Sequence, residues 1–562
     1  MLICKLKNYF LIASAGLILF LPFLGNVHLF DWDEINFAEA AREMIETGDY
    51  LTVRIDYEPF HEKPPLFIWF QVASMKIFGV NEFSARLPNA ITGILTLLIL
   101  FHIGKKVYNT DFGKLWALAY IGSFLPHFYF KSGIIDPVFN LFMFLGVYFL
   151  YRYHISSLKL PESVGNPSLM LLYAGFFTAC AILTKGPVGF LLPSLAFLIF
   201  ALIQRKEHTV SFLSVITYVI ISFVPYLIWY FSVQYFAGAD LLADFIAYHL
   251  RLLTTGDAGH SGPIYYHIVV LLFGCFPASF FFFKGLKKDE RDSIFQKNFS
   301  LILLILLLVV LVIFSLVKTK IIHYSSLSYF PITYFAARAM FNIGIRNHKA
   351  SKPLIFFVSL FGFLFALAIA LFPIALMDIE IFINKVTDIF TKAILLAEVE
   401  WGGWEWIVGL NLAVFTLLFI YLSIRQKPLK SYLALFVGVS LTIFLILPVL
   451  APKIDTYLQS APNEFYKKLQ GKDVYVHVLG YKSYAHYFYT KKPFHLSAKS
   501  KGISKDEWEY WLLNGEIDNP AFFVTNNKNH QKYLNSNPEL KLLYQKNGYV
   551  FLKREINEGE IN

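Results

Sequence analysis

Ionisable side chains gather in residues 30–83, a polar stretch that follows the first long apolar run of the chain. Asp33 and Glu34 stand near its start, and Glu62 and Lys63 stand further along in a Glu-Lys-Pro-Pro sequence. Carboxylates can exchange protons with a reacting group, and a lysine can attract an anion. Both also have simpler interpretations, because Asp33 fits a helix cap and Lys63 fits a lysine that extends along apolar surface toward water.

Three later positions carry similar chemistry. Asp136 precedes a proline, which also fits the start of a helix; Lys185 precedes Gly-Pro, which fits a tight turn. Tyr324 follows a histidine and fits an aromatic residue at a membrane–water interface. What these side chains can do depends on the elements that position them.

The composition indicates a membrane protein. The chain has 562 residues, of which 56% are hydrophobic, 18% aromatic and 16% charged, with a net charge of +10. A soluble domain has about 25% charged residues, so the composition excludes a disordered chain and argues against an ordinary soluble enzyme. The positive charge does not indicate nucleic acid, because no basic patch with interleaved aromatics lies outside the apolar runs.

The apolar runs predict a polytopic helical domain. A spanning helix needs about 20 mostly apolar residues, and about 13 stretches fit that requirement. They are residues 9–29, 84–104, 113–130, 137–153, 168–184, 187–204, 210–232, 263–284, 299–317, 321–341, 352–376, 404–424 and 430–450. We interpret the first as an uncleaved anchor, because no small-residue cleavage site follows it.

Lysine and arginine in alternate short loops predict the orientation. With the N-terminus in the cytoplasm, the inner loops carry Lys105, Lys106 and Lys114; Arg152 and Lys159; Arg205 and Lys206; Lys284, Lys287, Lys288, Arg291 and Lys297; Arg346, Lys349 and Lys352; and Arg425, Lys427 and Lys430. The loop 30–83 and everything after Pro452 then lie outside. Residues 1–452 are thus expected to form the membrane domain, and residues 453–562 an extracytoplasmic domain.

The outer loop is expected to contain two helices. Residues 34–46 place Ile35, Ala38, Arg42 and Ile45 near one face, which predicts an amphipathic helix on the membrane surface. Residues 66–79 are apolar but short for a span, so a second interfacial helix is expected there.

The tail has the pattern of a small α/β domain. Residues 474–478 and 521–525 read as buried strands, and residues 540–544 and 549–553 flank Asn547-Gly548, a hairpin signal. Residues 483–489 and 505–513 favour helices. No catalytic motif is found in the tail.

An ordered set of motifs over roughly the first 190 residues resembles the GT-C membrane glycosyltransferases. The resemblance is to the branch that contains the lipid A aminoarabinose (4-amino-4-deoxy-L-arabinose) transferases and the protein O-mannosyltransferases. The motifs are Asp33-Glu34, Ala38-Glu39-Ala40-Ala41-Arg42-Glu43-Met44, Glu62-Lys63-Pro64-Pro65-Leu66, residues 78–88, Asp136-Pro137, and residues 183–189. The resemblance implies an all-α polytopic membrane domain of GT-C type, with a small extracytoplasmic α/β domain at the C-terminal end.

The resemblance also implies a reaction. Such enzymes move a sugar from a polyprenyl-phosphate donor to an acceptor on the outer side of the membrane and invert the anomeric centre. Lys63 then corresponds to the phosphate-binding lysine of the family, and Asp33 and Asp136 correspond to its two acidic site positions. Asp33 would be a general base for a hydroxyl acceptor, whereas an acceptor phosphate is already an anion, so that Asp33 would orient it or stabilise charge on the sugar.

Further contacts are expected by the same resemblance. Arg251 and Tyr324 are candidates for the donor phosphate, and Lys185 is expected to lend charge to the cavity. A divalent metal, zinc or manganese, is a further expectation, with Glu62, His249 and His260 as candidate ligands.

Three assignments of substrate and class remain open. The acceptor is lipid A or another envelope glycolipid, or else Ser or Thr of an exported protein, and the donor sugar is not identified. A transporter of lipid-linked sugar is the alternative from another class, but it predicts ionisable residues near mid-membrane and repeated halves, and neither pattern is seen here. Membrane lipids and the polyprenyl-linked donor are the expected partners, in the inner membrane of a bacterium, with the active site and tail on the periplasmic side.

Overall fold

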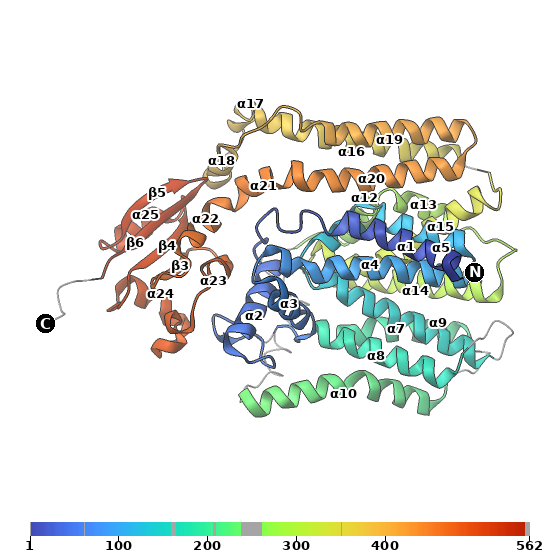
Figure 1. The fold of residues 1–562 in the computed structure, drawn as a ribbon, viewed down its shortest axis with the longest axis horizontal. Helices are drawn as coiled ribbons and strands as arrows, with labels where there is room; N and C mark the ends of the chain where they lie inside the picture. Colours follow the sequence, from blue (N-terminus) through green and yellow to red (C-terminus); the bar gives the residue numbers. More distant parts are fainter. Residues whose placement is uncertain are drawn as a thin grey trace.

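A bundle of long helices carries a small sheet domain at one end, and the start of the chain lies near the other end (Figure 1). This computed structural model describes residues 2–60, 62–158, 165–205, 210–237, 261–349 and 351–556. The bundle and the tail are both present as the sequence predicts.

Within the described residues, eight helices are long and apolar enough to cross a membrane. They are α4 (Glu82–Val107), α7 (Asp136–Ser157), α8 (Pro167–Lys185), α10 (Phe212–Ala237), α14 (Ile294–Leu316), α16 (Lys352–Met377), α19 (Ile407–Ile424) and α20 (Pro428–Val449). A ninth span is obtained if α12 (Tyr266–Gly274) and α13 (Ala278–Gly285), which meet at a bend of 103°, are counted together. The length and composition of the described helices therefore do not confirm the expected number of about 13 spans.

The other four predicted spans contain shorter or broken helices. These are α1 (Leu2–Phe20), α5 (Thr110–Ile121) followed by α6 (Phe124–Phe128) and η1 (Tyr129–Lys131), α9 (Val188–Ile203), and η4 (Ile322–Ser328) followed by α15 (Tyr329–Gly344). The break after α5 falls at Gly122, which lies directly against Phe436 of α20, so that a Cβ there would be 2.5 Å from the Phe436 Cβ. Hydropathy alone does not reveal such a break, because the apolar composition continues through it.

The helices differ in how much lipid-facing surface they keep. In α7, 83% of the apolar window is buried, so this helix runs through the middle of the bundle. In α10 only 11% is buried, which places it at the periphery; Figure 1 shows it at the lower edge.

The outer loop forms a compact layer between the bundle and the tail. It contains α2 (Asp33–Thr47), the short strands β1 (Arg54–Ile55) and β2 (Glu58–Pro59), and α3 (Leu66–Phe78). The two helices occur where they were expected, but the surface position predicted for the first is wrong. Every residue of α2 from Glu34 to Met44 is buried, because α3, β1 and the tail cover the faces that an interfacial helix would expose.

The tail begins with α21 (Ala451–Leu458) and α22 (Ser460–Leu469), which follow α20. Its sheet has the order β3-β4-β6-β5; β3 and β4 are parallel and the other pairs antiparallel. The elements are β3 (Tyr475–Leu479), α23 (Ala485–Thr490), η5 (Phe494–Leu496), η6 (Lys499–Lys501), α24 (Lys505–Asn514), β4 (Ala521–Asn526), α25 (His530–Ser536), β5 (Lys541–Lys546) and β6 (Tyr549–Arg554). All four predicted strands and both predicted helices of the tail are confirmed. Two short helices, α17 (Glu380–Ile383) and α18 (Ile389–Leu395), lie between α16 and α19 on the tail side (Figure 1).

A buried ionic contact fixes the tail on the outer loop. Lys492 Nζ lies 2.5 Å from Asp56 Oδ1, and both side chains are largely buried. The backbone carbonyl of Lys492 also accepts hydrogen bonds from Arg42 Nη2 at 3.1 Å and from the Tyr57 hydroxyl at 2.6 Å. The same Arg42 pairs with Glu39 one turn earlier on α2. The position of α2 is thus tied to the C-terminal part of the chain.

Candidate active site

Charged side chains from four separate segments meet in one cavity of about 520 Å³. Asp33 opens α2, Lys63 precedes α3, Asp136 opens α7 and Lys185 ends α8. His323 and Tyr324 of η4 complete the polar part of the lining. The rest of the wall is apolar and includes Phe37, Phe139, Leu192, Phe223, Ile313 and Phe314. One part of the cavity wall is therefore charged, and the rest is apolar.

The two aspartates of the cavity have different surroundings. Lys185 Nζ donates to Asp136 Oδ1 at 2.7 Å, and the Asp136 side chain is only 4% exposed. Asp33 keeps 47% of its side-chain surface exposed and has no lysine or arginine within ion-pair distance among the described residues. Asp136 is thus neutralised in place, whereas Asp33 presents its carboxylate to the open space.

His323 lies between these two acids. Its Nε2 atom is 3.6 Å from Asp33 Oδ2 and 3.8 Å from Asp136 Oδ2. Its segment is held against α7 by a hydrogen bond from Asn140 Nδ2 to Ser326 Oγ at 2.7 Å. Sequence reasoning placed His323 beside Tyr324 without giving it a role. A lone histidine in a broken helix has no pattern that would reveal two carboxylates from distant segments.

Asp33 is not a helix cap. The preceding residue, Trp32, is the N-cap of α2 and has φ 78°, in the left-handed region that a bulky residue rarely adopts. No side-chain hydrogen bond caps this end of the helix. The strained backbone thus directs the first residue of α2 into the cavity, as is common at functional sites.

Lys63 is a buried cation at the edge of the same cavity. Its Nζ atom lies 4.0 Å from Glu62 Oε2, and its side chain is 12% exposed. Burial lowers the pKa of Lys63; Glu62 opposes that shift, and Lys185 adds to it. The ring of Tyr324 lies 5.6 Å from Lys185 Nζ, so both lysines and the tyrosine border one region.

Glu34 faces away from the cavity. Its carboxylate accepts hydrogen bonds from Arg86 Nη2 at 2.7 Å, from Arg86 Nε at 3.0 Å and from the backbone N–H of Phe30, and it also contacts the backbone N–H of Gly133. Arg86 belongs to α4, and Gly133 lies in the loop before Asp136. Glu34 therefore joins the starts of α2 and α7, which positions Asp33 relative to Asp136. Arg86 was part of a predicted motif, but its role was not predicted.

The candidate metal ligands are not brought together in the described residues. Glu62 lies beside Lys63 and does not line the cavity, while Arg251, His249 and His260 lie outside the residues that the structure describes. No group of three His, Cys, Asp or Glu side chains suited to a metal occurs in the described part of the chain.

Comparison with known proteins identifies the family. The model of the family described as dolichyl-phosphate-mannose-protein mannosyltransferase matches residues 62–229. An uncharacterised protein of Aquifex aeolicus is 30% identical over 58% of this chain and 71% of its own length. The undecaprenyl phosphate-alpha-4-amino-4-deoxy-L-arabinose arabinosyl transferase of Shewanella sediminis is 24% identical over 80% of this chain and 78% of its own. The chain belongs to the GT-C membrane glycosyltransferases.

The fold agrees with that family. The crystal structure of ArnT from Cupriavidus metallidurans, bound to undecaprenyl phosphate, superposes with a TM-score of 0.74 at 18% identity and covers 98% of each chain. The predicted GT-C architecture, a multi-pass helical domain followed by a small sheet domain, is confirmed. Membership of a GT-C transferase family also favours an enzyme over the transporter interpretation.

Proposed function

We propose that this protein transfers a sugar from a polyprenyl-phosphate donor to an envelope acceptor, with inversion at the anomeric carbon. The observation that carries the proposal is the convergence of Asp33, Lys63, Asp136 and Lys185 on one cavity with an apolar flank. The reaction needs cations for a departing phosphate, a carboxylate beside the acceptor, and a surface for a hydrocarbon chain. The names of the relatives support the choice of a polyprenyl-phosphate donor.

The cations act on the leaving group. Lys63 provides a point charge for the donor phosphate, and Tyr324 offers a hydroxyl on the same side of the cavity. As the bond from the anomeric carbon to the phosphate oxygen breaks, negative charge accumulates on that oxygen, and a fixed cation stabilises it. The apolar residues of the wall, such as Ile313 and Phe314, suit the first isoprene units of the donor.

The carboxylates act on the other face of the sugar. Asp33 is the open one, so the acceptor oxygen approaches the anomeric carbon beside it. A hydroxyl acceptor would give its proton to Asp33, whereas an acceptor phosphate has none to give and would need only orientation. The Asp136 carboxylate pairs with Lys185, so these two opposite charges cancel within the cavity wall. Asp136 Oδ2 also lies 3.8 Å from His323 Nε2.

Lipid A or another envelope glycolipid is the acceptor we propose, on the side of the membrane that carries the tail. We propose a bacterial inner membrane with a periplasmic active site, and the basic loops at the opposite end support that orientation. Protein O-glycosylation is the second candidate, supported by the family model over residues 62–229.

The metal stays a prediction, and no step of this mechanism passes through one. The described residues do not form a metal site. Metal analysis of the purified protein, with and without the change Glu62→Gln, would test for one.

The central experiment compares cells with and without this chain. Mass spectrometry of envelope lipids and exported proteins identifies the sugar and acceptor together, and cells carrying Asp33→Asn or Lys63→Ala are then tested for the same product. We expect each change to lower transfer by roughly 100-fold or more. Glu46→Gln on α2 and Lys76→Ala on α3 are matched controls, because both residues are exposed and neither lines the cavity.

A measurement of lipid-phosphate binding distinguishes the proposed role of Lys63 from that of Asp33. Undecaprenyl phosphate represents the departing lipid, so Lys63→Ala should weaken its binding while Asp33→Asn should not. Full transfer activity in either variant would exclude the proposed site.

A further inference from the structure

A second cavity, of about 250 Å³, lies at the opposite end of the bundle from the tail. It is bordered by the end of α15 and α19 and by the start of α16 and α20, which Figure 1 places away from the sheet domain. This is the end whose loops carry the excess of lysine and arginine. None of the residues of the candidate active site lines it.

The cavity has an apolar wall and a polar mouth. Phe281, Ile343, Leu354 and Phe419 form much of the wall, and Asn347, Lys349, Ser423 and Gln426 contribute polar groups. This division suits a molecule that is polar at one end and hydrocarbon at the other. The volume suits a headgroup rather than a whole lipid.

Tyr432 provides an unused polar group in this cavity. The side chain is only 4% exposed, and its ring packs edge-on against Phe281 at 5.2 Å. Among the described residues its hydroxyl has no hydrogen-bond partner, although the residue lines the cavity. The residue lines the cavity, so its hydroxyl can donate to an acceptor oxygen of a ligand bound there.

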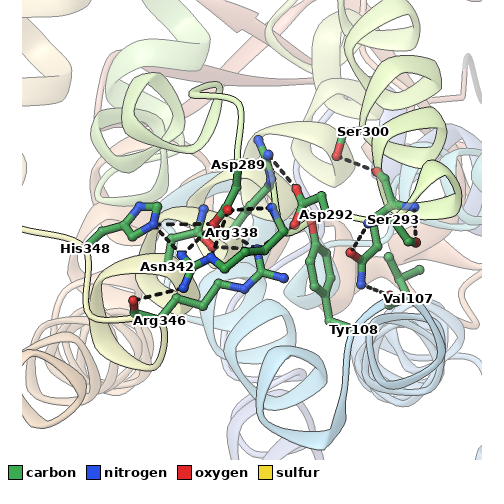
Figure 2. A network of polar contacts seen from close by, with 12 residues as sticks. Val107, Tyr108, Asp289, Asp292, Ser293, Ser300, Arg338, Asn342, Arg346 and His348 are labelled. Atoms are coloured by element: carbon green, nitrogen blue, oxygen red, sulfur yellow. Dashed lines mark hydrogen bonds and ion pairs between the residues drawn. The ribbon is translucent and has the colours of Figure 1, made fainter.

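The mouth carries an excess of positive charge. Residues 344–353 and 423–432 contain Arg346, His348, Lys349, Lys352, Arg425, Lys427 and Lys430, but no Asp or Glu. Part of this charge is met by acids of the 286–293 loop: Asp289 pairs with Arg291 and Arg346 and lies 3.4 Å from His348 Nε2, and Asp292 pairs with Arg338 and Arg346 (Figure 2). Glu290 of the same loop is exposed. Lys349 is exposed and has no acidic partner within the part of the chain that the structure describes.

Two helix starts add to this positive field. α16 and α20 both begin at this end, and neither N-cap residue, Ser351 or Lys427, makes a side-chain capping bond. Free N–H groups in a first turn favour an anion. Leu354 and Ser431, from the first turns of these helices, line the cavity.

We propose that this cavity binds the phosphate headgroup of an anionic phospholipid from the leaflet opposite the tail. The phosphodiester would lie between Lys349 and the Tyr432 hydroxyl, with the acyl chains along the exposed apolar face of α16, where Phe356 is 62% exposed. Basic pockets between helices at this membrane face are typical sites for anionic lipid headgroups. A zwitterionic lipid fits less well, because its cationic group would meet the basic rim.

The test measures the binding of phosphatidylglycerol and phosphatidylcholine to the purified full-length protein, by native mass spectrometry and by the shift in melting temperature. We expect phosphatidylglycerol to bind and stabilise, and Lys349→Glu to weaken its binding about tenfold or more. Tyr432→Phe should weaken it by a smaller factor, because only one hydrogen bond is lost. Ser423→Phe, which fills the cavity, should prevent binding without changing any charge.

The control is Lys7→Glu, which changes an exposed lysine near the start of α1 that does not line the cavity. It should leave phosphatidylglycerol binding unchanged. Equal loss in Lys7→Glu and Lys349→Glu would mean that only general surface charge attracts the lipid, which overturns the proposal. Stabilisation by inorganic phosphate equal to that by the lipid would overturn it as well, because the ligand would then be a free anion.

Discussion

At the scale of single residues, the two aspartates of the cavity have different surroundings, which suit them to different roles. Asp136 is buried and paired with Lys185, while Asp33 is half exposed and, within the described residues, has His323 as its ion-pair neighbour at 3.6 Å. Titratable groups whose surroundings differ in this way commonly take different roles in a reaction. The open position of Asp33 supports the proposal that it meets the acceptor.

The pKa of Lys63 predicts an alkaline limit to activity. Burial lowers this pKa, so in the free enzyme the side chain loses its charge at a lower pH than an exposed lysine does. The value of kcat/KM for the donor should therefore fall as pH rises through that lowered pKa, since kcat/KM reports groups of the free enzyme. Lys63→Arg keeps its charge at any such pH, and should move the fall to higher pH.

A pH series of kcat/KM checks this prediction, with Lys76→Arg as its control. That residue is exposed on α3, so its profile should match the unchanged protein. An alkaline fall at the same pH in Lys63→Arg would show that another group is responsible.

Several site residues could be predicted from sequence because motifs carry them in a fixed order. Asp33, Lys63, Asp136, Lys185 and Tyr324 were all named, and all line the cavity. His323 was missed as a site residue, since its two contacts come from segments about 290 and 190 positions away in the sequence, and only the folded chain brings them together. The role of Arg86 was missed for the same reason.

At the scale of elements, α2 shows how a helix pattern can be identified while its environment is misjudged. Apolar spacing correctly indicated a helix near residues 34–46, and its charged side chains suggested a solvent-exposed face. Those charges are buried instead: Glu39 pairs with Arg42, and Glu43 accepts hydrogen bonds from the backbone N–H groups of Asp56 and Tyr57. Burial of such groups is possible only because each finds a partner.

Lys492 should be essential to the docking of the tail on this layer. Replacing it with methionine leaves Asp56 as a buried, unpaired charge, which typically costs about 3–5 kcal/mol. We expect Lys492→Met to speed the proteolytic release of the tail and to lower transfer activity, because α2 and Asp33 lose support. Limited proteolysis of the purified protein and a transfer assay measure the two effects.

Lys505→Met provides the comparison, since Lys505 is exposed at the start of α24. It should leave both the proteolysis rate and transfer unchanged. The double change Asp56→Asn with Lys492→Met should recover part of the lost stability, and no recovery would argue against the pair as the cause.

At the scale of the whole molecule, the basic loops and the tail lie at opposite ends, which predicts the topology. Lys505→Cys should react with an impermeant maleimide in right-side-out spheroplasts, whereas Lys430→Cys should react only after lysis; both positions are exposed. The labelling is done in a Cys4→Ser background; of the two remaining cysteines, Cys275 is buried and Cys180 is half-buried within α8. Labelling of Lys430→Cys in intact spheroplasts would show that the orientation is the opposite of the predicted one.

The sequence predicted the strands of the tail but not the breaks in the helices of the bundle. The four strands of the tail were predicted because short apolar runs and the Asn547-Gly548 turn are local signals. Asn547 and Gly548 both have positive φ in the hairpin. The breaks within the apolar runs were not predicted, because a break such as Gly122 against Phe436 depends on contacts between distant helices.

The contacts of Lys492 with Asp56, Arg42 and Tyr57 have a consequence for how the protein is made. Asp33 emerges from the ribosome early, but the contacts that hold its helix come from residues more than 450 positions later. The layer that contains Asp33 therefore gains its full set of contacts only when the C-terminal part of the chain has been synthesised. A chain that stalls before that point lacks the contacts from Lys492 and Tyr484, although those within the first part of the chain can already form.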